Sequence, residues 1–345
     1  MEKEKTFIDL FCGAGGMSYG FEMAGFRPVL AIDNWQDALD TYIYNNPRVT
    51  TLCADLSVID VRKVASDFRI KEVDLIIGGP PCQGFSVAGK RIVEDIRNKL
   101  YKSFVSFVEF FSPEMFVMEN VPNILSIGEG MVREAILADF RSLGYNVKYK
   151  VLTASDYGVP QNRRRAIFVG AKNGDFEFPV PSVKNKVTVS QALSDLPECS
   201  VNNGSEYEKP EQSTYQKWAR SKSNGIYNHE ITEHNERTQH IISLVPDGGN
   251  YRDLPEEYRN TRKVHIAWTR LNSQKPSITI DTGHRHHFHY CFNRIPTVRE
   301  CARLQSFPDN YVFLKSRTSQ YKQVGNAVPP LMAAAIAEEI KRTLK

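Results

Sequence analysis

The chain has 345 residues, of which 41% are hydrophobic and 24% charged, a composition typical of a globular protein. Its formal net charge of +4 is too small by itself to indicate a nucleic-acid partner. No stretch approaches the roughly 20 apolar residues that cross a bilayer, and no signal-peptide core precedes the first strand-like segment. Six cysteines without a CxxC pair predict neither a zinc ribbon nor a disulfide framework. We therefore expect a cytoplasmic protein with reduced thiols.

Short apolar segments alternate with helical ones up to about residue 170, which predicts a parallel α/β sheet with helices on both faces. Helices are expected over 17–24 and 131–143, each followed by a glycine that can adopt the left-handed turn. A last helix is expected over 329–344, with two prolines at its start. The main strands are expected at 6–10, 29–32, 73–77, 115–118 and 166–169.

The first expected strand leads into a glycine-rich turn, FCGAGG at 11–16. Glycines let a backbone turn tightly and approach a ligand at the start of the next helix. The spacing differs from the GxGxxG of dinucleotide enzymes, which argues against a dehydrogenase. The second strand ends at Asp33, where this class of fold commonly binds ribose hydroxyls, and Asp55 follows the next short strand. Either acid taken singly could be an ordinary surface turn residue, but their order after successive strands favours a nucleotide site.

The fourth strand, VDLIIGG, breaks into the turn PPCQGFS at 80–86. A lone cysteine is more often a small buried hydrophobe, but two prolines before Cys82 and a glycine after it predict a rigid turn. The fifth strand ends in MENV, which places the carboxyl of Glu119 at the same edge. Cys82 and Glu119 on neighbouring strand ends suit a nucleophile and an acid.

After residue 181 the sequence becomes polar and irregular for more than 100 residues, which is too long for a loop and predicts a second domain. Acidic residues outnumber basic ones by 12 to 8 over 182–257, whereas 258–299 holds eight Lys or Arg and the single acid Asp281. Aromatic residues are interleaved with that basic stretch. It could bind a phosphate backbone and bases, or could simply be a solvated surface.

These motifs resemble those of the cytosine-carbon-5 DNA methyltransferase family, and they occur in that family's order. The pattern PPCQGFS, then ENV, then QxRxR is highly specific, and the resemblance covers the chain except for the region after residue 181. The motifs are DLFCGAGG (9–16), GGPPCQGFS (78–86), MENV (118–121), QNRRR (161–165), RECARLQSFPD (299–309) and QVGNAVPP (323–330).

The resemblance implies a doubly wound, Rossmann-like fold that uses S-adenosylmethionine, with a second, smaller and irregular recognition domain. The catalytic domain would span 1–181 and be completed by 320–345, and the target-recognition domain and hinge would span 182–319. It also implies that Cys82 is the nucleophile, that Glu119 holds and protonates the base, and that Arg163 and Arg165 orient the cytosine and its phosphate. The cofactor-binding residues it implies are Phe11, Gly13, Gly15, Asp33, Asn34, Asp55, Pro80 and Asn326.

The chemistry explains why these residue types are needed. Carbon 5 of cytosine is a poor nucleophile, but a thiolate that adds at carbon 6 makes it electron-rich. A carboxyl at ring nitrogen 3 and arginines near the carbonyl oxygen stabilise the charge that develops. The target base must leave the stack, as expected for DNA methyltransferases. We expect 83–100 to be a loop that closes over it, with Gln83, Ser86 and Arg97 as DNA contacts.

Within the recognition domain, Arg270 and Arg285 are candidates for contacts with bases, because arginine binds guanine through two hydrogen bonds. The four histidines at 284, 286, 287 and 289 lack a cysteine or acid at ligand spacing, so no metal site is expected.

The expected partner is double-stranded DNA in the nucleoid, with action as a monomer, and by analogy beside a separate restriction endonuclease. A tRNA methyltransferase and a catalytically silent DNA-binding relative remain alternatives.

Overall fold

The computed structural model describes residues 4–81, 99–259, 268–281 and 287–344, which divide into two compact units. Unit 1 comprises 1–153, 164–180 and 332–345, and unit 2 comprises 154–163 and 181–331. The sequence had assigned 154–163 and 320–331 to the catalytic domain. Both segments instead bond within unit 2, because Gln161 Nε2 donates to Gln305 Oε1 at 2.9 Å and Gln305 Nε2 donates to the Val324 carbonyl at 2.9 Å.

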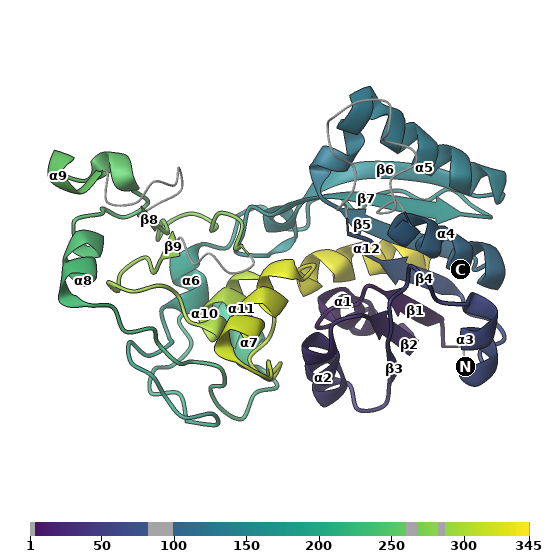
Figure 1. Cartoon of the computed structure of the whole chain (residues 1–345). Coiled ribbons are helices and arrows are strands. Elements are labelled where there is room, and N and C mark those ends of the chain that lie inside the picture. Colours follow the sequence, from purple (N-terminus) through teal and green to yellow (C-terminus); the bar gives the residue numbers. More distant parts are fainter. Residues whose placement is uncertain (1–3, 82–98, 260–267, 282–286, 345) are drawn as a thin grey trace. The chain divides into compact units, whose positions relative to one another are not determined.

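A seven-stranded sheet forms the centre of unit 1, in the order β3-β2-β1-β4-β5-β7-β6 (Figure 1). The first five strands in that order are parallel, whereas β7 is antiparallel to both β5 and β6. The expected parallel sheet therefore continues into two antiparallel strands at this edge. The strands are β1 (Thr6–Leu10), β2 (Arg27–Asp33), β3 (Thr50–Cys53), β4 (Leu75–Gly78), β5 (Met115–Asn120), β6 (Asn146–Thr153) and β7 (Arg164–Ala171).

Helices lie on both faces of this sheet (Figure 1). One face packs against α3, α4 and α5, whose apolar residues join those of β1, β2 and β5 in one hydrophobic cluster. On the other face, Phe7 of β1 contacts Phe21 of α1 with ring centroids 5.8 Å apart. The helices of unit 1 are α1 (Gly16–Met23), α2 (Gln36–Asn45), α3 (Val61–Asp67), α4 (Lys99–Phe111), α5 (Met131–Ser142) and, from residue 332, α12 (Pro330–Thr343).

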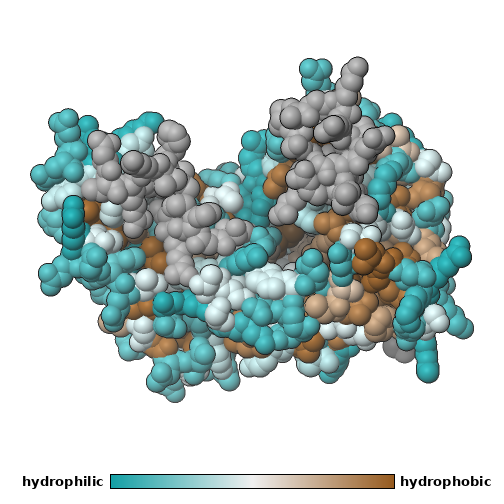
Figure 2. Space-filling view, in the orientation of Figure 1, coloured by the Kyte–Doolittle hydropathy of each residue, from teal (hydrophilic) through white to brown (hydrophobic). Residues whose placement is uncertain are grey.

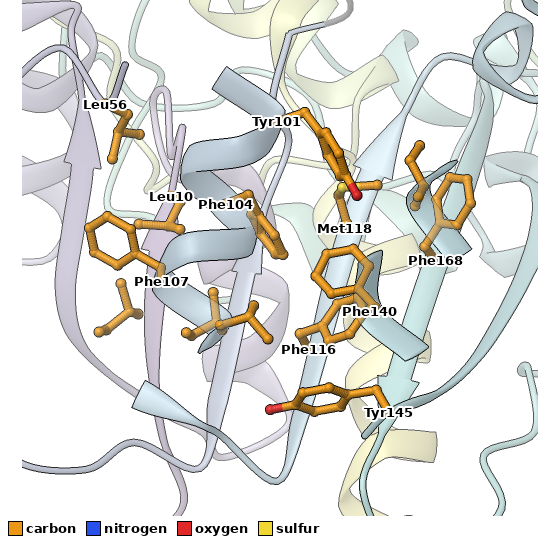
Figure 3. Packing of buried hydrophobic residues seen from close by; sticks show 14 of the residues in the cluster. Leu10, Leu56, Tyr101, Phe104, Phe107, Phe116, Met118, Phe140, Tyr145 and Phe168 are labelled. Carbon is orange, nitrogen blue, oxygen red and sulfur yellow. The ribbon is translucent and has the colours of Figure 1, made fainter. Parts of the chain in front are cut away.

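Aromatic side chains fill the core beneath α4 and α5 (Figure 3). Phe116 of β5 lies between Phe140 and Tyr145, with ring centroids 4.0 Å and 5.3 Å away. Gly170 of β7 pairs with Phe116, and a Cβ at that glycine would lie 2.0 Å from the Phe116 ring. Only glycine therefore allows β7 to pair with β5 beside this ring.

Unit 2 consists of short helices and a two-stranded sheet joined by irregular segments. Its centre is a fully buried ion-pair network, in which Arg303 binds both Asp195 and Asp309. Arg299 donates to the carbonyls of Pro308 and Tyr311. The elements are α6 (Val189–Leu193), α7 (Thr214–Arg220), α8 (Glu236–Ser243), α9 (Glu256–Arg259), β8 (Thr269–Arg270), β9 (His287–Phe288), α10 (Val298–Leu304) and α11 (Arg317–Asn326).

Hydrophobic residues on the surface form separate patches between hydrophilic ones on the face shown in Figure 2. Across the four described segments of the chain, no helix combines the length and the apolarity needed to cross a bilayer.

Candidate active site

The carboxyl ends of β1, β2, β4 and β5 lie side by side, because Leu10 pairs with both Ile32 and Gly78, and Gly78 pairs with Met118. Open α/β sheets bind ligands at this edge. Most of the unit 1 residues that the sequence predicted to be catalytic or cofactor-binding lie at or just after these strand ends.

The turn after β1, residues 11–15, is here called the cofactor loop. Phe11, Gly13 and Gly15 all have positive φ angles, of 59°, 53° and 83°. Left-handed backbone is costly for a side chain such as that of Phe11, so the surrounding structure must enforce it. A Cβ at Gly13 would meet nothing within 4 Å, so open space adjoins the loop there.

Asp33 fixes the cofactor loop from the end of β2. Its Oδ2 accepts from the Gly13 amide at 2.8 Å, and its Oδ1 accepts from the Trp35 amide at 2.9 Å. Asn34, between the two bonded segments, is exposed. The open space at Gly13 beside this carboxylate fits a nucleoside cofactor.

Asp55 lies beside this site, because the Ala54 amide donates to the Asp33 carbonyl at 3.0 Å. The Asp55 side chain is exposed and accepts from the Ser57 amide at 2.8 Å, which lowers the pKa of Asp55. The carboxylate is thus ionised and accessible, as an acceptor for an amino group would be.

The turn that leads to Cys82 is held by Asn120, a residue to which the sequence had given no role. Asn120 Nδ2 donates to the Pro80 carbonyl at 2.8 Å, and its Oδ1 accepts from the Val121 amide at 2.9 Å. Both Pro80 and Asn120 are buried. The motif MENV could have indicated this, because an amide can donate and accept at once.

Glu119 forms an ion pair with Arg165, from Nε to Oε1 at 2.6 Å, and each side chain is only 13% exposed. The second carboxylate oxygen points toward Gly79, where a Cβ would lie 2.9 Å from Oε2. Gly78 is constrained similarly, because a Cβ there would lie 2.3 Å from the Leu10 carbonyl oxygen. The two glycines before the proline turn therefore allow β1 and β4 to approach and leave room for the Glu119 carboxylate.

Arg163 and Asn326 lie together in unit 2. Arg163 is 2% exposed, and its Nη2 donates to the Asn326 carbonyl at 3.4 Å. The segment before Arg163 pairs with residues of the recognition region, because the Asn162 amide donates to the Ser277 carbonyl and the Ile280 amide donates to Gln161 Oε1. Gln161 is a second residue whose role the sequence analysis missed.

Arg270 has a different environment from that expected of a base contact. It is 5% exposed, and all five of its N–H groups donate within unit 2, so none is left for a base edge. The acceptors are the carbonyls of Ile242, Val245, His289 and Phe292 and the side chain of Asn293. The structure thus contradicts the predicted base contact, and Arg270 instead holds the recognition region together.

Only some of the basic side chains in the stretch 258–299 are therefore exposed on the surface. Arg294 binds Glu300 through two hydrogen bonds of 2.8 Å, and Arg299 is fully buried, whereas Arg259 and Lys275 are exposed. Five predicted site residues lie outside the described residues, namely Cys82, Gln83, Ser86, Arg97 and Arg285.

Residues 5–342 match the family described as C-5 cytosine-specific DNA methylase. The chain is 41% identical over 339 residues to the type II methyltransferase M1.HphI of Haemophilus parahaemolyticus, covering 97% of this chain and 86% of that protein. It is 39% identical to M.DdeI of Desulfomicrobium norvegicum, covering 97% and 88%. A solved structure of a candidate DNA modification methyltransferase encoded within an E. coli prophage superposes with a TM-score of 0.84 at 30% identity, covering 99% of each chain.

Proposed function

The chain belongs to the C-5 cytosine-specific DNA methylase family, and from that premise we propose how it acts. It is a DNA cytosine-5-methyltransferase of the restriction-modification type. We propose that it transfers a methyl group from S-adenosylmethionine to carbon 5 of a cytosine within a specific sequence of double-stranded DNA. The reaction proceeds through a covalent adduct with Cys82 on a base flipped out of the duplex.

The observation that carries this proposal is the Glu119–Arg165 pair beside the turn that Asn120 holds at Pro80. That turn leads directly to Cys82, so a thiol, a carboxylate and a guanidinium belong to adjoining chain segments. A protein that only binds DNA has no need of these three groups together, which disfavours the catalytically silent alternative.

In the proposed reaction, the Cys82 thiolate forms a bond to cytosine carbon 6, and the ring electrons move toward carbon 5 and nitrogen 3. Glu119, as the neutral carboxyl, binds nitrogen 3 and donates its proton to it, and Arg165 stabilises the carboxylate that this transfer leaves. Arg163 is the other arginine proposed to orient the cytosine and its phosphate. After methylation, a base takes the carbon-5 proton, the electrons of that bond re-form the ring double bond, the thiolate departs from carbon 6, and nitrogen 3 returns its proton to Glu119.

The residues that would hold the cofactor are Phe11, Gly13, Gly15, Asp33, Asn34, Asp55, Pro80 and Asn326. When bound, S-adenosylmethionine supplies an electrophilic methyl group. The positive φ angles of the cofactor loop and the open space at Gly13 support this assignment, since a backbone of that shape can approach a ligand closely.

We further propose that the protein acts as a monomer on DNA, separately from a cognate restriction endonuclease. The type II methyltransferases among its relatives support DNA over tRNA as substrate.

The test is incubation with duplex DNA containing 5-fluorocytosine and S-adenosylmethionine. Fluorine at carbon 5 cannot leave as a proton does, so the wild type should accumulate a denaturation-resistant protein–DNA band. Cys82→Ser should abolish the band, whereas Cys199→Ser, which alters an exposed cysteine, should retain it. A wild-type band formed with tRNA and not with DNA would overturn the DNA assignment, and a band with Cys82→Ser would overturn the nucleophile.

A further inference from the structure

Three buried side chains form a chain of hydrogen bonds behind the cofactor loop. The Tyr42 hydroxyl donates to Ser18 Oγ at 2.8 Å, and Ser18 Oγ donates to Asp9 Oδ2 at 2.5 Å. Each of the three side chains is at most 1% exposed. They come from α2, α1 and β1, so the chain of bonds joins three elements around the loop.

The start of α1 has no side-chain cap, and a side chain of its first turn is instead bonded to β1. Gly15 is the N-cap residue, has a left-handed conformation and has no side chain that could accept a hydrogen bond from a backbone amide of the first turn. Helix starts usually obtain such a bond from a Ser, Thr, Asp or Asn cap. The Ser18 side chain, in the first turn of α1, donates to Asp9 of β1 and so attaches the helix that directly follows the cofactor loop to the sheet.

Tyr42 also belongs to a hydrophobic cluster that includes a residue of the cofactor loop. The other members of this buried cluster are Cys12 of the loop, Ala31 and Leu39. Tyr42 thus bonds to the helix after the loop through its hydroxyl and shares a packed cluster with the loop. No ligand role is implied, because the Tyr42 side chain is completely buried.

A second link joins the same two helices one turn further along. When the Asn46 side-chain amide is oriented with its nitrogen toward Glu22, that nitrogen donates to both Glu22 carboxylate oxygens, at 3.1 and 3.2 Å. Ser18 and Glu22 are four residues apart on α1, and Tyr42 and Asn46 are four residues apart along α2 and its cap. Residues at this spacing lie on one helix face, so the two links form a ladder between the helices.

We propose that Tyr42, acting through Ser18 and Asp9, is a positioning residue that sets the affinity of the cofactor loop for S-adenosylmethionine. This inference rests on the proposed cofactor. Asp33 holds the loop at the Gly13 amide, and the Tyr42 chain holds it where α1 begins. Loss of the second attachment lets the loop leave its binding conformation, which weakens cofactor binding. The Glu119–Arg165 pair comes from β5 and β7, so turnover at saturating cofactor should change little.

The experiment compares Tyr42→Phe with Tyr145→Phe. Tyr145 is the matched control, because it is 3% exposed, lies in unit 1, and donates its hydroxyl to the Pro113 carbonyl at 2.7 Å, away from the loop. Cofactor Kd is measured by calorimetry well below each variant's melting temperature, with KM and kcat from methyl transfer. We expect Tyr42→Phe to raise Kd and KM about 5-fold with kcat within twofold, as loss of one buried hydrogen bond predicts.

Ser18→Ala provides the second variant and should raise Kd at least as much, since it breaks both bonds. The double variant Ser18→Ala/Tyr42→Phe should be no worse than Ser18→Ala alone, because both remove the same Tyr42–Ser18 bond. If Tyr42→Phe and Ser18→Ala bind the cofactor within twofold of wild type, the inference is wrong. If Tyr145→Phe weakens binding as much, the effect is general destabilisation and the inference is also wrong. A wild type that fails to bind S-adenosylmethionine would instead overturn the proposed cofactor.

Discussion

Arg165 Nε lies 2.6 Å from Glu119 Oε1, and both side chains are about seven-eighths buried, at 13% exposed each. An exposed ion pair contributes little, but a mostly buried one loses much when either partner is removed, because the other is left unpaired. The two residues belong to antiparallel neighbours, β5 and β7, so their geometry is set by the sheet. Glu119 is therefore held in one orientation before any base arrives.

We expect Arg165→Lys to reduce methyl transfer by roughly 10²-fold, because lysine keeps the charge but cannot reproduce the planar guanidinium contact. Cofactor Kd should stay within twofold. The measurement is single-turnover methyl transfer to DNA. Arg164→Ala is the control, since Arg164 is the exposed neighbour. Equal activity of Arg165→Lys and wild type would remove this pair from the reaction.

Asp33→Ala should weaken S-adenosylmethionine binding by about 1–3 kcal/mol, since it leaves the Gly13 and Trp35 amides without an acceptor and removes an acceptor for ribose. Calorimetric titration gives the Kd directly. Asp67→Asn, which alters a surface acid paired with Lys63 in α3, should not change it. An unchanged Kd for Asp33→Ala would show that this carboxylate does not serve the cofactor.

Arg270→Ala should destabilise unit 2 by about 2–4 kcal/mol, because the carbonyls it satisfies become unpaired in a buried environment. Thermal unfolding followed by circular dichroism measures this. Arg237→Ala removes an exposed arginine of α8 and should leave stability unchanged within about 0.5 kcal/mol. Were Arg270 a base contact after all, its variant would lose DNA specificity while melting like the wild type.

The sequence predicted the parts of the fold that local pattern determines. The strand expected at 6–10 is confirmed as β1, and α5 begins at the expected Met131. β6 was missed because it is an edge strand, with polar residues exposed along much of NVKYKVLT, and so lacks an apolar run. The antiparallel direction of β7 was also missed, since strand direction depends on how the chain returns to the sheet.

Within the site, residue type indicated which side chains approach one another but not which hydrogen-bond partners each side chain has. Asp33 was predicted as a ligand of ribose, yet its bonds to backbone amides of the cofactor loop needed three-dimensional structure to find. Charge was the weakest guide, because a buried Arg270 and a surface arginine look alike in a sequence. Arg270 bonds to carbonyls that are distant along the chain, so no pattern in the neighbouring sequence indicates that it is buried.

Asp9 should make the stability of the protein fall as pH rises. Burial, with Glu22 and Asp33 nearby, raises the pKa of Asp9 from 3.8 to about 8, although the Ser18 hydrogen bond opposes this. The folded state thus retains a proton that the unfolded state loses above pH 3.8. The resulting stabilisation is complete below that pH and disappears as pH rises toward 8, with a slope approaching about 1.4 kcal/mol per pH unit.

The measurement is the melting temperature of wild type and Asp9→Asn between pH 4.5 and 9, since the amide cannot ionise. The melting temperature of the wild type should fall relative to that of Asp9→Asn as pH rises to about 8. Above pH 8 the difference between the two melting temperatures should stay constant. Glu22, whose pKa burial raises to about 7, provides an internal comparison, because Glu22→Gln should remove a slope that ends nearer pH 7. The exposed variant Asp67→Asn should follow the wild type throughout. If Asp9→Asn also follows the wild type at every pH, the Asp9 carboxyl is ionised in the fold, and the proton assigned to it here is absent.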